Sequence, residues 1–495
     1  LSRCRIQQKG TRIVMNVKAR GQLSHLTAFL LCICGLVPVT FAQTAEDESQ
    51  NVRMIGYHPL QGCQALQVTT KSDVDNGDWL YIGHVPNTRT GDATLNPITG
   101  ANEWNGTSLV DISDPANPEL IWHIPNALRA NSRSVSVVYD YGFDSEPTGR
   151  DYLIRNSEAG DDLKFQIFDI ISRSTNPEQV SLVAEITATP ENSCGPGCGG
   201  KLSSRAHKGW WSPETGLFYS SSGEPGFRTA LMHIWDLREP ANPQFVGRCW
   251  LPGQKDDEAG FEEQYVHHPV VDEENNRIYA GFREGSGHIA AWDIEDPAQP
   301  VLVWSYDTSP PGRGPHTVSP IIYDQVPNIT AAGGELPRTY ALVTDEYGPE
   351  CSRGVKSRVY MFDITHESNP MPLTTWQVPV GDFCEIGGNF GPHQHAETVN
   401  GDLNRFEDKL VWLAYLNAGV RVLDISDPQN LREVGYYIPK TNAPARVAGE
   451  RAAVIELTDV DIDHRGLVYA SDRSGESCMG QDESCVGTGL FVFGL

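Results

Sequence analysis

One recurring phrase constrains the fold of this chain more than any other feature. Its clearest copy is VRVLDISDPQNLREVGYYI, at residues 420–438. The β-branched start favours a strand, Asp427-Pro428 favours a type I turn, and the second apolar stretch favours another strand. The phrase therefore predicts a two-stranded hairpin.

Five further copies of the hairpin phrase precede this one. They read LVDISDPANPELIWHI from Leu109, IFDIISRSTNPEQVSLVAEI from Ile167, IWDLREPANPQFVGRCWL from Ile234, AWDIEDPAQPVLVWSY from Ala291 and MFDITHESNPMPLTTWQV from Met361. The aspartates that anchor the six copies are 58, 67, 57, 70 and 61 residues apart: Asp111, Asp169, Asp236, Asp293, Asp363 and Asp424. Such repeats indicate a propeller or a solenoid, and a period near 60 residues is too long for the rungs of a parallel β-helix.

Each unit also holds two strands before its hairpin. The later units open with histidine, as in HKGWWSPETGLFYSSSGE from His207 and HHPVVDEENNRIYAGFREG from His267, and a seventh unit starts at Val460. We therefore expect an all-β, seven-bladed β-propeller of four-stranded blades. Because the seventh unit ends before its outer strand, an N-terminal strand at 54–57 or 64–70 should complete it and close the ring.

The N-terminal 42 residues have the pattern of a leader. From Met15 a basic start is followed by an apolar run of 14 residues at 26–39 and then by Thr-Phe-Ala before Gln43. This run is shorter than the ~20 residues that span a bilayer, so it favours a cleaved signal peptide over an anchor. We expect residues 1–42 to be upstream residues and signal peptide, 43–52 a disordered tail, and 53–495 the propeller of a periplasmic or secreted protein.

The charge of the chain excludes two kinds of partner. The leader holds six basic and no acidic side chains, so the remaining chain carries 32 basic and 64 acidic ones, a net charge of −32. A surface this acidic repels nucleic acid and anionic lipid. We expect no nucleic-acid partner, and no membrane partner after cleavage of the signal peptide.

Eight cysteines follow the leader, and an oxidising compartment favours disulfide bonds between them. Close spacing pairs four of these cysteines, and elimination pairs the others: Cys194–Cys198, Cys478–Cys485, Cys351–Cys384 and Cys63–Cys249. Zinc binding by the two closely spaced pairs is the alternative.

Histidines occupy matching places in four consecutive units. They are His207, His267 or His268, His316, and His393 or His395. The first strand of each propeller blade lines the central channel, so equivalent positions should converge at one mouth. Neutral imidazole is a good ligand for copper, iron, zinc or nickel. The pattern predicts a transition-metal site, copper or iron first; a polar channel that binds only water is the alternative.

Charged residues near the same positions are further candidates. Glu397 lies two residues beyond His395, where it can be a ligand or can fix a histidine tautomer. We take Glu397 and Arg283 as candidate catalytic residues. A larger set is expected near the channel mouth, to bind an anionic or polar substrate or to form ordinary salt bridges: Arg133, Arg283, Asp345, Glu346 and Arg473.

Two acidic segments have oxygen ligands at alternate positions, which suits calcium. Their residues are Asp73, Asp75, Asn76 and Asp78 in one segment, and Asp459, Asp461 and Asp463 in the other. A surface loop and a hairpin turn are the respective alternatives. No nucleotide-binding motif is present.

The segment 419–428, GVRVLDISDP, and its five variants resemble the LVIVD-repeat proteins, over nearly all of 53–495. That family consists of bacterial, often exported, propeller-like proteins, so the resemblance implies architecture and export. The layout of the histidines is also similar to that of two propeller enzyme families, the selenium-binding-protein/methanethiol-oxidase proteins and the carotenoid oxygenases, in which channel histidines hold a metal.

These observations lead to two functional hypotheses. The first is an exported, copper- or iron-dependent oxidoreductase that acts on a small molecule. The second is a non-catalytic module that binds a protein or glycan at the cell surface through its blade loops.

Overall fold

The computed structural model divides the chain into Leu1–Ala42 and Gln43–Leu495. The residues it describes all belong to the second unit: 47–73, 77–85, 94–95, 99–103, 105–127, 130–141, 149–159, 162–170, 179–187, 206–260, 265–283, 287–309, 314–327, 335–346, 351, 356–397, 409–441, 454–473 and 487–495. The predicted signal peptide lies outside these ranges. Within them, no helix is long and apolar enough to cross a membrane.

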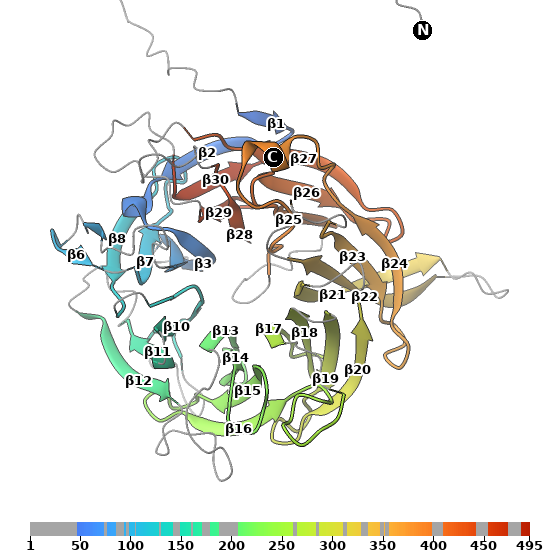
Figure 1. Ribbon diagram of the computed structural model, residues 1–495. Coiled ribbons are helices and arrows are strands. Elements are labelled where there is room, and N and C mark those ends of the chain that lie inside the picture. The colour runs from blue at the N-terminus through green and yellow to red at the C-terminus, as the bar shows by residue number, and fades with distance from the viewer. Residues whose placement is uncertain are drawn as a thin grey trace, which may run out of the picture. The chain divides into compact units, whose positions relative to one another are not determined.

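Seven four-stranded antiparallel sheets surround a central axis (Figure 1), which confirms the predicted all-β, seven-bladed propeller. From the innermost strand outward, blade 1 contains β3 (Ala65–Asp73), β4 (Gly77–His84), β7 (Thr107–Asp111) and β8 (Glu119–Ile124), blade 2 contains β9 (Val135–Val138), β10 (Tyr152–Ala159), β11 (Asp162–Asp169) and β12 (Ser181–Thr187), and blade 3 contains β13 (Ala206–Trp211), β14 (Leu217–Ser222), β15 (Leu231–Asp236) and β16 (Gln244–Cys249). In the same order, blade 4 contains β17 (Tyr265–Asp272), β18 (Arg277–Arg283), β19 (His288–Asp293) and β20 (Val301–Asp307), and blade 5 contains β21 (Pro315–Pro327), β22 (Glu335–Asp345), β23 (Val359–Asp363) and β24 (Met371–Trp376). Blade 6 contains β25 (Leu410–Ala414), β26 (Val420–Asp424), β27 (Arg432–Ile438) and β1 (Glu48–Gln50), and blade 7 contains β28 (Leu457–Ile462), β29 (Val468–Asp472), β30 (Leu490–Gly494) and β2 (Arg53–His58).

Three short elements lie outside these seven sheets. They are a two-stranded sheet of β5 (Thr94–Leu95) and β6 (Asn102–Glu103), the 3₁₀ turn η1 (Leu60–Gly62), and α1 (Phe383–Ile386). The main apolar contacts lie within and between neighbouring blades, as where Trp412 of blade 6 packs with Phe493 of blade 7.

The repeated aspartate ends the third strand of blades 1 to 5 and ends β26 in blade 6, and in each blade it precedes the next strand. In Asp111, Asp293 and Asp424 the carboxylate accepts a hydrogen bond from the backbone N–H two residues later, at 2.8, 2.8 and 2.9 Å. This Asx turn fixes the chain direction after the strand. The phrase is therefore the structural signature of the outer hairpin.

The ring closes through an N-terminal strand, as expected. The strand β2 pairs antiparallel with β30, with Arg53 opposite Gly494 and His58 opposite Leu490. The alternative segment, 64–70, instead belongs to β3, the inner strand of blade 1. Of the two predicted closing strands, 54–57 is the correct one.

The tail is more ordered than its polar composition predicts. Disorder was expected over 43–52, but Glu48–Gln50 form β1, in which Glu48 lies opposite Ile438 and Gln50 opposite Tyr436. The backbone N–H of Lys440 also donates to Asp47 at 2.9 Å. An exposed strand edge offers unpaired backbone groups that accept a polar segment as readily as an apolar one.

Blade 6 departs from the expected pattern at its axis. The segment from His393 was predicted to be its first strand, yet it is not a regular strand. It still lies inside β25, because the backbone N–H of His393 donates to Ala414 at 2.9 Å and that of Ala396 donates to Trp412 at 3.0 Å.

Side-chain carboxylates reinforce the closure between blades 7 and 1. The backbone N–H and the hydroxyl of Thr70 donate to Asp461 Oδ2 at 2.7 and 2.8 Å. The backbone N–H of Val68 donates to Asp459 Oδ2 at 2.9 Å. These aspartates bind the edge of β3 where no ladder of backbone hydrogen bonds joins the two sheets.

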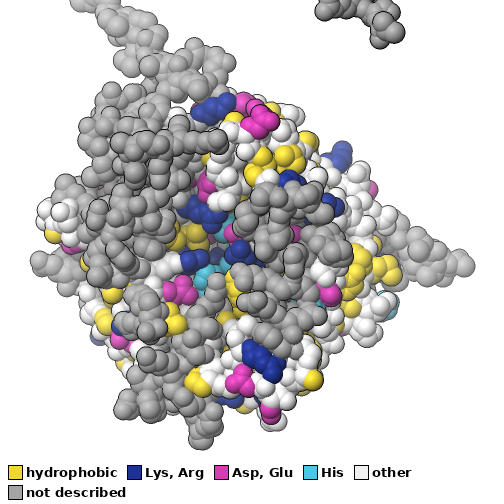
Figure 2. Space-filling model, viewed as in Figure 1, with side chains coloured by type: hydrophobic (Ala, Val, Ile, Leu, Met, Phe, Trp, Pro, Cys, Tyr) yellow, Lys and Arg dark blue, Asp and Glu magenta, His cyan; other side chains and the backbone are white. Residues whose placement is uncertain are grey.

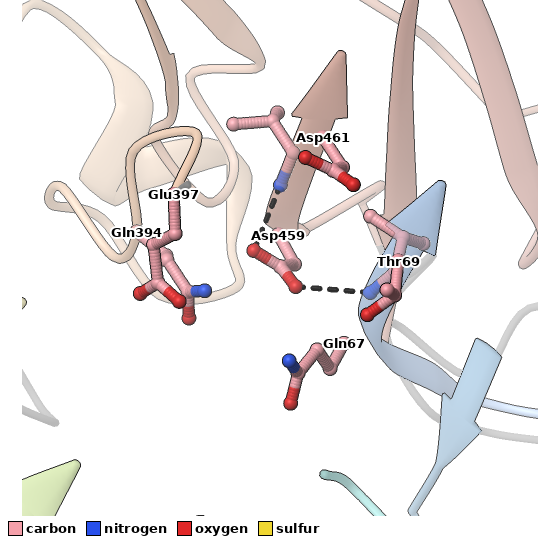
Figure 3. A pocket seen from close by; sticks show the side chains of 8 residues that line it. Gln67, Thr69, Gln394, Glu397, Asp459 and Asp461 are labelled. Atoms are coloured by element: carbon pink, nitrogen blue, oxygen red, sulfur yellow. Dashed lines mark hydrogen bonds between the residues drawn. The ribbon is translucent and has the colours of Figure 1, made fainter. Parts of the chain in front are cut away.

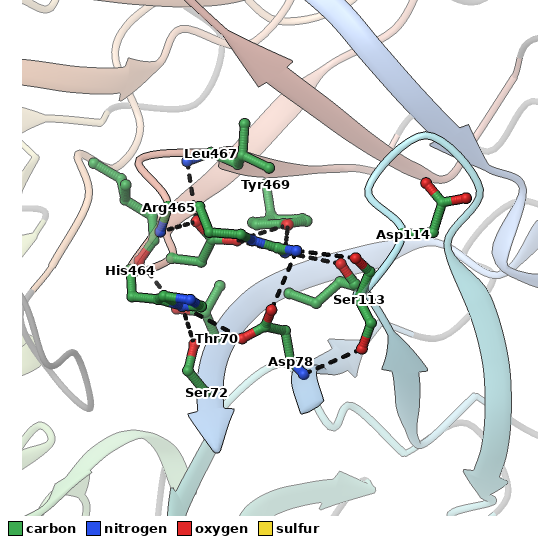
Figure 4. A network of polar contacts seen from close by, with 12 residues as sticks. Thr70, Ser72, Asp78, Ser113, Asp114, His464, Arg465, Leu467 and Tyr469 are labelled. Atoms are coloured by element: carbon green, nitrogen blue, oxygen red, sulfur yellow. Dashed lines mark hydrogen bonds and ion pairs between the residues drawn. The ribbon is translucent and has the colours of Figure 1, made fainter. Parts of the chain in front are cut away.

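The polar network around the neighbouring turn uses the remaining acidic groups (Figure 4). Asp463 accepts from Tyr469 at 2.9 Å and from Arg465, whose guanidinium also lies 3.1 Å from Asp78. Protein donors thus account for the alternate acidic spacing in this segment without a calcium ion. Asp75 and Asn76 of the other proposed calcium segment lie outside the described residues, and the side chain of Asp73 is not described.

One of the predicted disulfide bonds is present and one is wrong. Cys351 and Cys384 are bonded, whereas Cys63 and Cys249 are buried thiols that are not joined in a disulfide bond. Cys63 directly follows η1 and precedes β3 in blade 1, while Cys249 ends the outer strand of blade 3, so the two thiols belong to separate blades. The other two predicted pairs lie outside the described residues.

Removal of a closing carboxylate should destabilise the ring. Asp461→Ala leaves the buried donors of Thr70 without their acceptor, which should lower the free energy of unfolding by about 2–3 kcal/mol. Urea denaturation measures this loss. Asp114→Ala, at an exposed turn of blade 1, is the matched control and should change the midpoint little. Equal midpoints for both variants would contradict the closing role of Asp461.

The cysteine assignment predicts a specific peptide map. When the unreduced protein is unfolded, alkylated and digested, peptides containing Cys351 and Cys384 should remain linked. Cys63 and Cys249 should carry the alkyl group. A linked Cys63–Cys249 peptide would contradict the structure.

Candidate metal centre in the channel

Backbone irregularities place the histidines at the axis. In blades 3, 4 and 5 the pairing of the inner strand with the second strand shifts between Ala206 and Gly209, between Val266 and Pro269, and between Pro315 and Thr317. His207, His267–His268 and His316 lie in these bulges. A β-bulge redirects side chains away from the regular alternation of a strand. Proline, which cannot donate to the ladder, favours such positions.

The structure brings four of the predicted histidines into mutual contact. His207 Nε2 lies 3.0 Å from His267 Nε2. The ring centroids of His267 and His316 are 3.7 Å apart, and those of His316 and His393 are 4.4 Å apart. Imidazoles from four consecutive blades thus form one cluster, and each is at most 3% exposed.

Two overlapping groups of these residues have the geometry to hold a metal ion. One contains His267, His268 and His316, and the other contains His316, Glu346 and His393. Within each group the ligand atoms lie within 4.8 Å of one another. His316 belongs to both groups and is therefore the centre of the candidate site.

The hydrogen bonds of His316 and His393 leave ligand atoms available. The Oγ1 atom of Thr317 lies 2.8 Å from His316 Nδ1, while His316 Nε2 is buried and has no hydrogen-bond partner among the described residues. His393 Nδ1 bonds the carbonyl oxygen of Thr458, which can only accept, so Nδ1 carries the hydrogen and Nε2 the lone pair. A buried nitrogen without a partner is costly unless something binds it.

Glu397 lies behind the ligands rather than among them. Its Oε1 atom bonds His268 Nε2 and accepts from the hydroxyl of Thr317 at 3.3 Å. Through these two contacts one carboxylate orients both His268 and His316. This is the role that carboxylates have beside metal-bound histidines.

The imidazole of His395 contacts a serine rather than the other predicted ligands. Its Nε2 atom lies 2.8 Å from Ser319 Oγ, and it belongs to neither group of described residues that could hold a metal. Of the two alternatives in blade 6, His393 is the one in the cluster.

Burial keeps the histidines neutral. It lowers the pKa of His393 to about 3 and that of His395 to about 4, and neighbouring cations act in the same direction on His393. The pKa values of His267 and His316 fall well below their usual range, through burial first and then through the adjacent histidines. The ring nitrogens at the centre therefore keep lone pairs for a metal at neutral pH.

The two carboxylates remain ionised despite their burial. Burial opposes ionisation of Glu346, but Arg283, His393, Arg473 and Arg133 together lower its pKa to about 2. Burial also opposes ionisation of Glu397, but His268, Lys208 and His395 together lower its pKa to about 2. The centre thus combines neutral imidazoles with anionic oxygens.

From the sequence, Glu346 and Arg283 were expected near the channel mouth, but Glu346 was not predicted to be a metal ligand. The Arg283 guanidinium forms an ion pair with Glu346, which fixes the carboxylate beside His393. A signal was present: Arg283, Glu346 and Arg473 stand at the same place in FREG, DEYG and SDRSG, where second strands end.

Sequence reasoning missed Lys208 entirely. Its side chain is fully buried, and its Nζ atom donates to Gln394 Oε1 across the channel from blade 3 to blade 6. Beside it, a small polar pocket is lined by Gln67, Thr69, Gln394, Glu397, Asp459 and Asp461, with Val68 and Val460 (Figure 3). Nothing in the sequence around Lys208 distinguishes it from a surface lysine.

The family model of the LVIVD repeat matches residues 101–124 and 409–438. These segments contain the first and the sixth copies of the hairpin phrase. The chain therefore contains LVIVD repeats at these two places, in agreement with the resemblance of its hairpin phrases. A comparison with curated proteins found no match.

Solved structures similar to this chain include two lactonase-type proteins. A putative 6-phosphogluconolactonase from Bacteroides fragilis is 10% identical, with a TM-score of 0.47, over 85% of this chain and 99% of that chain. The periplasmic gluconolactonase of Pseudomonas aeruginosa is 12% identical, with a TM-score of 0.43, over 79% of this chain and 98% of that chain. Likenesses this distant carry no argument about function.

The geometry of Glu397 predicts a measurable effect on metal affinity. Glu397→Gln removes the charge that orients His268 and His316, so affinity for added Co²⁺ should fall about 10- to 100-fold. Titration followed by cobalt absorption measures it. His395→Gln, a buried neighbour outside both groups, is the control and should bind Co²⁺ as the wild type does. If His395→Gln lowered the affinity for Co²⁺ more than Glu397→Gln did, these assignments would be overturned.

Proposed function

We propose that the histidine cluster binds one transition-metal ion, copper or iron, and that the protein is an exported, metal-dependent oxidoreductase acting on a small molecule. The observation that carries the proposal is the convergence of buried, neutral imidazoles on His316, whose Nε2 lacks a partner among the described residues. A site of this kind is costly to build unless it is filled.

The chemistry of the donor set supports a redox metal. The two groups offer imidazole nitrogens and one carboxylate, with neither thiolates nor an all-oxygen cage. Two histidines with one carboxylate are typical of non-haem iron sites that keep open positions, and imidazole also suits copper. His316, Glu346 and His393 form such a set.

The surrounding residues have distinct parts in this proposal. Arg283 positions Glu346, and Glu397 holds the rings of His268 and His316. A redox metal, when bound with an open position, supplies electron-transfer or oxygen chemistry. The buried setting keeps bulk water from the centre and strengthens its electrostatic interactions.

Access to the centre favours a small substrate. Histidine side chains lie beside lysine and arginine side chains near the middle of one face (Figure 2). The imidazoles themselves are almost fully buried, so only a small molecule can approach them without opening the blades.

Metal analysis of the purified protein tests the proposal. We expect about one copper or iron ion per chain, retained after dialysis. His316→Ala combined with His393→Ala should abolish binding, because it removes both histidines of the group that contains Glu346. His366→Gln, at an exposed turn of blade 5, should retain the metal.

Absence of bound metal, in the wild type and after reconstitution with Cu²⁺ or Fe²⁺, would overturn the proposal. Recovery of a specific protein or glycan ligand by that metal-free protein would instead favour the non-catalytic module.

A further inference from the structure

We propose that the substrate of this centre is a small organic anion, held by Arg283 and Arg473 at the channel mouth. This inference rests on the proposed metal-dependent function and names the class of molecule it acts on. The positions and the contacts of the two arginines support it.

The arginines come from equivalent positions of different blades. Arg283 ends β18 and lies opposite Tyr265, at the start of an inner strand. Arg473 follows β29, whose last residue, Asp472, lies opposite Leu457 at the start of β28. Both positions are at the end of the channel where the inner strands begin, which is also the end that holds the histidines.

Glu346 connects the two arginines to the metal centre. It follows β22, the second strand of blade 5, and lies 3.8 Å from His393 Nε2. Arg283 forms an ion pair with its Oε2 atom, and Arg473 Nη1 lies 4.0 Å from its Oε1 atom. Glu346 Oε1 thus lies near both Arg473 and His393, while Oε2 pairs with Arg283.

Burial places the arginines between the solvent and the cluster. The side chains of Arg283 and Arg473 are 15% and 24% exposed, whereas His316 is fully buried. A molecule entering from this mouth must pass the guanidinium groups before it reaches the imidazoles.

The charges at the mouth favour an anion. The whole chain has a net charge of −26. At the channel mouth, however, the charges of Arg133, Arg283 and Arg473 all lower the pKa of Glu346. A divalent ion bound by neutral imidazoles and one carboxylate keeps a net positive charge. Arg283 pairs with Glu346 and Arg473 pairs with Glu456 at 3.2 Å, so these two guanidinium groups and two carboxylates balance, and the positive charge of the bound ion attracts an anion. Guanidinium also matches the planar, two-oxygen geometry of a carboxylate.

One polar contact crosses the channel beside the cluster. Lys208 from blade 3 donates to Gln394 from blade 6, and both side chains are 2% exposed. These blades lie far apart around the ring, so the contact spans the axis (Figure 1). In this proposal the substrate reaches the metal from the arginine-lined mouth, at the end where the inner strands begin.

Cobalt-loaded protein provides the test, because Co²⁺ absorption reports a change in its ligands. We expect acetate, used as the probe anion, to perturb the spectrum in a saturable way, and acetamide, its neutral isostere, to have no such effect. Arg473→Gln should weaken acetate binding about tenfold or more, since it removes a charged hydrogen-bond donor. Arg473→Lys should restore part of the affinity, and Arg283→Gln is the second variant. Arg432→Gln, in an exposed ion pair with Asp424 on blade 6, is the charge-matched control and should bind acetate normally.

The possible outcomes separate this inference from the proposed function. If Co²⁺ binds but acetamide binds as well as acetate, or if Arg473→Gln matches the wild type, the anion inference is overturned and the metal centre stands. If Co²⁺ does not bind, the metal centre fails and the anion inference fails with it.

Discussion

The pairing of β2 with β30 is the contact on which the rest of this structure depends. It joins the start of the folded chain to its end, so that blade 7 is built from both. Residues more than 400 positions apart become neighbours in one sheet, as Arg53 and Gly494 do. Without that strand the last blade would expose an open edge, and the seven inner strands would lose their common axis.

Closure also explains why polar groups accumulate at the axis. In a closed ring, the first residues of the inner strands lie near one another around the axis. The β-bulges turn the side chains of these residues toward the channel. Where backbone pairing between strands ends, carboxylates form the contacts between blades. Asp459 and Asp461 accept hydrogen bonds from β3, and Glu397 of blade 6 contacts His268 of blade 4 and Thr317 of blade 5. Such buried networks stabilise a fold only when their members are satisfied. The Nε2 atom of His316 is an exception, since it has no hydrogen-bond partner among the described residues.

Much of this organisation could be predicted because repetition is visible in a single chain. The six aspartate phrases specified the outer hairpins, and the histidines that open successive units specified the cluster. Periodicity was less informative where the backbone is irregular. Alternation could not choose between His393 and His395, because that segment is not a regular strand.

Features that depend only on proximity in three dimensions could not be predicted from the sequence. Cysteine spacing says nothing of which blades are adjacent, so elimination paired Cys63 with Cys249 wrongly. Edge pairing of β1 depends on unsatisfied backbone groups of β27, which have no side-chain signature. Lys208 crosses the channel to a partner 186 residues away, and only the closed ring shows that its ammonium is buried.

The central claim is that imidazoles from separate blades share one metal ion, and the most direct test is a crystal structure of metal-loaded protein with anomalous diffraction at the metal edge. We expect one strong peak at the channel axis, about 2.0–2.2 Å from His316 Nε2 and from nitrogen or oxygen atoms of its neighbours in the cluster. A peak on the outer surface, or an axis that holds only water after metal loading, would contradict it.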